Sequence, residues 1–162
     1  MAQEPEYIYP PNTLKSKVTV DAGTVDLVAI DMAERSIMDM KDDYLVWVKD
    51  DIEKLQGAYD KAVADKAGRA GAQEEIYAFT HDIKGQGGSF GYPLMTAVGN
   101  VLCKFMEGVD GTLSDAQLEV VKVHIDTMRL VITQKIEGDG AKVGQQLLKG
   151  LDAIIAKVSA GE

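Results

Sequence analysis

Residues 45–62, LVWVKDDIEKLQGAYDKA, decide the fold class of this chain. Apolar side chains recur there at alternating spacings of three and four residues, at Leu45, Val48, Ile52, Leu55, Tyr59 and Ala62. This spacing places them along one face of an α-helix, as in helices that pack lengthwise against other helices. The stretch predicts a long amphipathic helix. Tyr44 and Trp47 lie beside this seam, so we expect them in the core or at its boundary.

Further stretches of helical period follow, separated by short turns. They cover about 72–89, the residues after Pro93, the residues after Ser114, and 143–158. Proline suits the first position of a helix, and Ser114 with Gln117 fits a capping box. Short connections favour antiparallel neighbours, and no stretch keeps the period of two that strands require. We therefore expect an all-α fold, an antiparallel up-and-down four-helix bundle with an additional N-terminal helix or extended arm.

The N-terminal residues have a different composition. Residues 1–24 hold three of the four prolines, which disfavour helix. We expect a tail or arm over 1–24 and the helical bundle over 25–162. Residues 28–40 are mostly apolar but less regular, and they fit either a separate short helix or an extension of the long one.

The composition excludes several classes of partner. The formal net charge is −9, and nucleic acids and anionic membranes both favour basic surfaces. No segment approaches the roughly 18 apolar residues that span a bilayer, and the N-terminus lacks a basic-then-apolar leader pattern. Cys103 is the single cysteine, so no internal disulfide forms. We expect a cytoplasmic protein that binds neither nucleic acid nor membrane.

His81 is one of two histidines, and it lies within the predicted helix 72–89. At roughly 100° per residue, Ile76, Phe79 and Ile83 cluster on one side of this helix, nearly opposite His81. Because those apolar residues need the core, the sequence predicts that the His81 imidazole faces solvent.

Small and cationic residues share the predicted face of His81. Lys84, Gly85 and Gly88 follow it at i+3, i+4 and i+7. Each glycine inside a helix costs roughly 1 kcal/mol relative to alanine, so the glycines need a reason. Absent side chains would let another protein approach His81 closely, and the lysine could neutralise a phosphoryl group on the ring. Close helix packing is the other explanation, and Gly87 is a candidate for it.

The remaining reactive residues fit structural roles better. Asp82 lies about 100° around the helix from His81, where a solvated carboxylate is expected. His124 falls at the edge of the apolar stripe of the helix after Ser114 and lacks a Lys-Gly neighbourhood, so we interpret it as structural or surface. Cys103 is expected to be a small packed or boundary residue.

Two segments resemble a known family. Residues 81–85, HDIKG, with Phe90-Gly91 after them, are similar to the H-x-[aliphatic]-K-G…[apolar]-G signature of histidine phosphotransfer domains. Residues 102–107, LCKFME, resemble the L-C-x-x-[apolar]-E segment of that family's next helix. The similarity covers roughly residues 40–158, with the specific motifs confined to 76–107. The resemblance implies a four-helix bundle with an extra N-terminal helix.

The resemblance also implies roles for single residues. His81 would be the phosphoacceptor, Lys84 would stabilise the phosphoryl group, and Gly85 would permit docking. Tyr77, Gly85, Gly88 and Lys104 are expected to contact the partner. Many family members carry a glutamine on the third helix near the histidine, where this chain has Asn100, Cys103 and Lys104. The resemblance therefore assigns no helper role to those residues or to Gln86.

The implied partners are response-regulator receiver domains, a hybrid histidine kinase, or both. The donor would be an aspartyl phosphate in a receiver, which also contributes Mg²⁺ and most catalytic groups. This chain would then need no cofactor and no metal. It shows no Walker loop or kinase-type ATP-binding region, so we expect a phosphoryl carrier without kinase activity, acting as a monomer.

Other functions fit the sequence less well. The strongest is a non-catalytic helical scaffold or adaptor that docks response regulators, and the intact His81 and Lys84 count against it. A metal- or haem-binding bundle would need ligand patterns such as Glu-x-x-His, which the two histidines do not form. A kinase dimerisation domain would need an attached ATP-binding domain.

Overall fold

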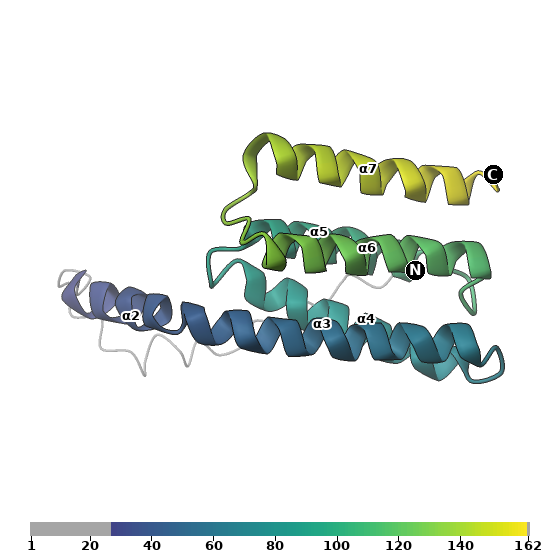
Figure 1. Cartoon of the computed structure of the whole chain (residues 1–162), viewed down its shortest axis with the longest axis horizontal. Coiled ribbons are helices and arrows are strands. Elements are labelled where there is room, and N and C mark those ends of the chain that lie inside the picture. Colours follow the sequence, from purple (N-terminus) through teal and green to yellow (C-terminus); the bar gives the residue numbers. More distant parts are fainter. Residues whose placement is uncertain (1–26, 162) are drawn as a thin grey trace, which may run out of the picture. The chain divides into compact units, whose positions relative to one another are not determined.

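The computed structural model describes residues 27–161, without the side chains of residues 38 and 42. This part of the chain contains helices and no strand (Figure 1). The helices are α2 (Leu27–Asp39), α3 (Lys41–Ala64), α4 (Arg69–Gly87), α5 (Pro93–Glu107), α6 (Asp115–Thr133) and α7 (Ala141–Ser159). The all-α prediction is confirmed for these residues. The predicted tail over 1–24 lies outside them.

The chain divides into two units, residues 1–34 and 35–162, with the division inside α2. Residues 28–40 could form a separate helix or extend the long one, and a break at Met40 decides between these two alternatives. Its backbone has φ −83° and ψ 1°, and its N–H donates to the carbonyl of Ile37, only three residues earlier. α2 is therefore a helix separate from α3.

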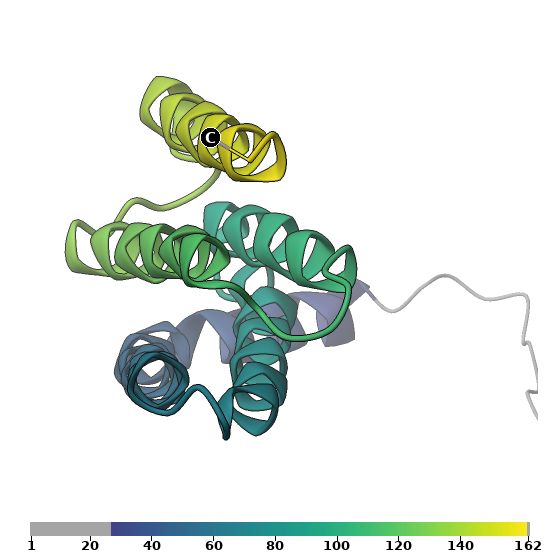
Figure 2. The same cartoon turned by 90° about the vertical axis from the view of Figure 1, so that its right-hand side faces the viewer.

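Helices α3 to α7 pack in layers within the second unit. α3 contacts α4 and α6, and α5 contacts α4, α6 and α7. Figure 2 views these helices roughly end-on. It shows α3 beside α4, α6 beside α5, and α7 on the side of the α5–α6 pair away from α3 and α4. α4 is therefore covered by α3 and α5 and keeps an outer side, on which the candidate site lies.

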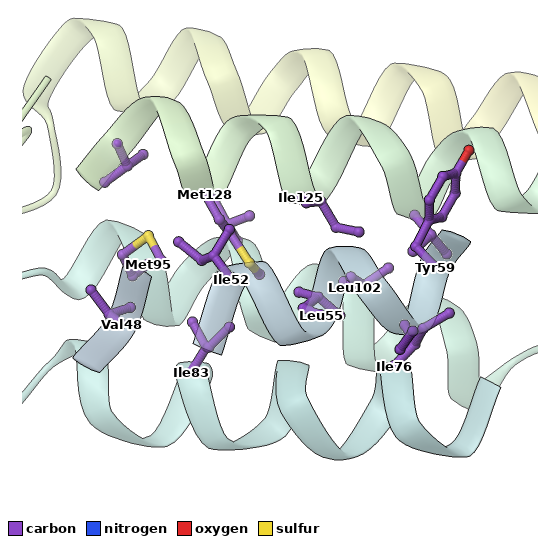
Figure 3. Close-up of a cluster of buried hydrophobic side chains, with 14 of the residues drawn as sticks. Val48, Ile52, Leu55, Tyr59, Ile76, Ile83, Met95, Leu102, Ile125 and Met128 are labelled. Carbon is purple, nitrogen blue, oxygen red and sulfur yellow. The ribbon is translucent and has the colours of Figure 1, made fainter. Parts of the chain in front are cut away.

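The core is built from the apolar faces that the sequence predicted. In Figure 3, Val48, Ile52 and Leu55 of α3 face Ile83 of α4 and Met128 of α6. All five side chains are buried. Burying a side chain of this size is worth about 1.5–3 kcal/mol, so this cluster fixes which side of α4 turns inward.

The aromatic residues beside the seam behave differently from each other. Tyr44 is fully buried and stacks on Phe90, with ring centroids 4.6 Å apart and planes 11° apart. Trp47 is 44% exposed, so the core or boundary position predicted for it is wrong. The reason is rotational: Tyr44 and Val48 point into the bundle, and Trp47 lies on the neighbouring side of the helix.

The ends of the helices follow local sequence rules. Pro93 opens α5, and Ser114 and Gln117 form the predicted capping box of α6. α4 begins at Arg69, earlier than predicted. The buried Arg69 guanidinium donates to the carbonyl oxygens of Ala62 (2.8 Å) and Leu113 (2.9 Å), which ties the first turn of α4 to its neighbours.

Candidate functional site

His81 lies on the outer side of α4 and is exposed, as the sequence predicts. The buried residues of α4 are on the opposite side and include Ile76, Thr80, Ile83 and Gly87. An imidazole in this position is accessible to a second protein without any movement of the bundle.

Tyr77 lies one turn before His81 and contacts it. The two ring centroids are 6.3 Å apart with an angle of 26° between the planes. The Tyr77 hydroxyl donates to Glu107 Oε1 of α5 at 2.7 Å, and this hydrogen bond is the main cause that raises the pKa of Tyr77. The tyrosine ring is thus anchored to α5 and limits the positions that the imidazole can take.

Lys84 lies one turn after His81, at the seam between α4 and α5. A Cβ added to Gly99 of α5 would lie 2.9 Å from Lys84 Cβ, so the two helices touch here. Among residues 27–161, the Lys84 ammonium has no ion pair. Its positive charge acts on Cys103. Burial raises the pKa of that thiol, and the charge of Lys84 lowers it by a smaller amount.

A threonine of α5 holds the end of α4 in place. Thr96 Oγ1 donates to the Lys84 carbonyl at 2.9 Å and accepts from the Gly88 N–H at 2.9 Å. Those two backbone groups are four residues apart, so the hydroxyl bridges the pair that would form the next helical hydrogen bond. The glycine-rich end of α4 is therefore tied to α5.

The three glycines within residues 85–88 have different surroundings. A Cβ on Gly87 would lie 2.8 Å from the Tyr92 carbonyl oxygen, so Gly87 is required by packing, the role suggested for it. A Cβ on Gly88 would meet only Thr96 Oγ1, at 3.7 Å. A Cβ on Gly85 would meet nothing within 4 Å. Nothing in the described fold explains why Gly85 lacks a side chain.

The residues weighed for a helper role differ in their exposure. Cys103 is buried, and Gln86 is half-buried on α4. Lys104 is exposed, and with Asn100 it lines a groove of about 390 Å³ that α7 closes with Asp152 and Ile155. No hydrogen bond joins Lys104 or Asn100 to His81 among the described residues.

Residues that the sequence did not single out complete the surroundings of His81. Thr96, Gly99 and Glu107 of α5 each contact the His81 face of α4, and Ala78 is a small exposed residue one turn before His81. Of these residues, only Glu107 could have been noticed in the sequence, as the last residue of the LCKFME segment. The positions of Thr96 and Gly99 near His81 depend on which α5 residues lie opposite α4.

His124 has the opposite environment. It is fully buried in α6, with Nδ1 2.7 Å from the Val120 carbonyl oxygen and no partner for Nε2. Burial lowers the pKa of His124, against smaller raising effects of the Val120 hydrogen bond and the Asp152 charge. No protein could reach this ring in the folded state.

Within residues 27–161, no group of three or more His, Cys, Asp or Glu side chains is arranged to hold a metal ion. In the same residues, every helix is too short or too polar to cross a membrane. Comparisons of the chain with protein-family models, with curated proteins and with solved structures find no match.

Proposed function

We propose that this chain is a histidine phosphotransfer protein, in which α3 to α6 form an antiparallel four-helix bundle that presents His81 to receiver domains. The observation that carries the proposal is the exposed imidazole one turn before Gly85, a helical glycine that the described fold does not require. A glycine inside a helix lowers its stability relative to alanine. Beside an exposed imidazole, however, the missing side chain would let another protein approach closely.

The proposed reaction transfers a phosphoryl group between two proteins. A neutral ring nitrogen of His81 attacks the phosphorus of an aspartyl phosphate in the receiver. The N–P bond forms as the acyl O–P bond breaks, the aspartate leaves as a carboxylate, and the ring proton passes to solvent. The reverse reaction with a second receiver moves the group onward. The transition state is loose, so orientation of the imidazole is the main contribution of this chain.

The neighbours of His81 support that orientation. The Tyr77 ring contacts the imidazole and is itself fixed by Glu107. The Lys84 ammonium, without an ion pair among the described residues, is one turn from His81 and within reach of phosphoryl oxygens. We assign Mg²⁺ and the remaining catalytic groups to the partner receiver.

The test is direct labelling. Purified receiver domains, phosphorylated with ³²P, are mixed with the chain, and the label on the chain is followed with time. We expect label that is lost in acid and kept in base, as for phosphohistidine. Receivers that bind the chain without labelling it would contradict the proposal and would identify a non-catalytic scaffold instead.

A further inference from the structure

A groove of about 240 Å³ lies beside the His81 site, between α4 and α5. It is lined by Gln73, Glu74 and Tyr77 of α4 and by Met106 and Glu107 of α5. Tyr77 belongs to both places, because its ring contacts His81 and also forms one wall of the groove. The groove therefore adjoins the exposed imidazole, with the Tyr77 ring between them.

The walls of this groove combine apolar and acidic groups. Met106 is 5% exposed, and with the Tyr77 ring it provides apolar surface. Two exposed carboxylates, Glu74 and Glu107, stand beside it, and no cationic side chain lines the groove. A long side chain with an aliphatic stem and a cationic end matches this combination, because the stem packs on apolar walls while the charge meets carboxylates.

The polar side chains of the groove differ in how many hydrogen bonds they already make within the chain. Gln73 is engaged at both ends of its amide, since it donates to the Gly111 carbonyl at 3.2 Å and accepts from the Leu113 N–H at 2.9 Å. Glu107 accepts from Tyr77 through one carboxylate oxygen, which leaves the other for a second donor. Glu74 has no hydrogen bond or ion pair within residues 27–161. Both carboxylates can therefore receive an external cation.

The groove lies close enough to His81 for one bound protein to cover both. Glu74 and His81 are seven residues apart on α4, which is two helical turns or about 10 Å along the axis. A protein interface covers about 800 Å² per partner, enough to include both places. A receiver bound at His81 would thus cover the groove as well.

We propose that this groove binds an arginine or lysine side chain of the receiver domain that exchanges phosphoryl groups with His81. The proposal rests on the phosphotransfer function. It adds a specificity contact outside the reacting groups: receivers with a basic residue at the matching position bind more tightly than receivers without one.

Charge variants of the groove test this proposal. The probe is the receiver domain that labels His81 fastest, used unphosphorylated so that binding is measured apart from transfer. We expect Glu74→Gln and Glu107→Gln each to weaken binding about two- to five-fold, and Glu74→Lys about ten-fold. Glu107→Gln keeps an acceptor for the Tyr77 hydroxyl. Glu119→Gln and Glu119→Lys on α6 make the same charge changes away from the site and are expected to bind like the parent.

Salt dependence separates a lost ion pair from a distorted surface. The slope of log Kd against log salt concentration should become shallower for Glu74→Gln and stay unchanged for Glu119→Gln. Changing the receiver's basic residues to glutamate one at a time should reveal one change that weakens binding to the parent and restores binding to Glu74→Lys.

The outcomes keep the two proposals distinct. If His81 is labelled but the Glu74 and Glu119 variants bind equally well, the groove proposal is overturned and the phosphotransfer function stands. Tighter binding by Glu74→Gln would overturn it in favour of an apolar occupant. If no receiver labels His81, both proposals fail.

Discussion

The two histidines of this chain show how helix packing decides the chemistry open to one type of side chain. His81 lies on the outer side of α4 among small residues, within reach of another protein. His124 lies inside the bundle, with one ring nitrogen at a backbone carbonyl and the other without a partner. The difference comes from the position of each residue relative to the apolar stripe of its helix. The position of a histidine on its helix thus decides whether its ring is accessible to another protein.

Replacing each histidine in turn tests the contrast between them. His81→Gln should abolish ³²P uptake from a phosphorylated receiver with no change in the thermal midpoint, because an exposed side chain is lost. His124→Asn should still take up label, because the buried ring has no access to a receiver. Labelling of the first variant, or loss of labelling in a folded second variant, would reverse the assignment of the two histidines.

The glycines extend the contrast between surface and core. Gly87→Ala should lower the free energy of unfolding by about 1–3 kcal/mol, because the new methyl group meets the Tyr92 carbonyl. Gly85→Ala should raise it by up to about 1 kcal/mol, because the methyl group enters open space in a helix. Urea unfolding followed by circular dichroism measures both.

Gly57→Ala provides the matched control for Gly85. Gly57 is an exposed glycine of α3 whose added Cβ would also meet nothing within 4 Å. Both variants should gain stability, but only Gly85→Ala should slow labelling by the receiver. Equal labelling rates would mean that no partner approaches the helix at Gly85.

A further difference between the two histidines is the cationic side chain of Lys84 beside His81, whose effect on phosphoryl transfer can be measured. Lys84→Gln should slow phosphoryl transfer about ten-fold, equivalent to about 1.4 kcal/mol of transition-state stabilisation, without weakening receiver binding to the same extent. Lys142→Gln on α7 removes the same charge from an exposed position away from the site. A similar small effect of both variants would show only a dependence on net charge.

Burial of His124 should make the free energy of unfolding depend on pH in the acid range. Because burial lowers the pKa of His124, the folded chain favours the neutral ring, whereas the unfolded chain takes up a proton at about pH 6.5. The contribution to stability is complete above that pH and is lost as the pH falls toward the lower folded-state pKa. His124→Asn keeps an N–H donor for the Val120 carbonyl and does not titrate. Its free energy of unfolding should therefore fall less than the parent's between about pH 7 and pH 5. Parallel losses in urea titrations would contradict this prediction.

The sequence was sufficient wherever one helix decided the outcome. The 3–4 spacing in residues 45–62 predicted the buried face of α3, and the positions of Ile76 and Ile83 predicted the exposure of His81. The Ser114–Gln117 capping box is a local hydrogen-bonding pattern and was also predicted correctly. In each case the periodicity or the local chemistry of a few residues contains all the information required.

The sequence was insufficient wherever two helices meet. The roles of Gly85, Gly87 and Gly88 differ because different α5 residues lie opposite them, and α4 alone does not fix that alignment. The contact between Tyr77 and Glu107 depends on the same alignment. Trp47 was misplaced for a related reason: its size suggests burial, but the neighbouring helices cover another side of α3.

The Thr96 hydroxyl between Lys84 and Gly88 bears on the energetics of the proposed docking. Glycine-rich helix ends normally fray, and a partner that binds one must first restrict its motion. Here the bridge ties that end to the neighbouring helix, so its amide protons should exchange slowly with deuterium in the unbound protein. A receiver would then meet backbone that is already preorganised, and less conformational entropy would be lost on association.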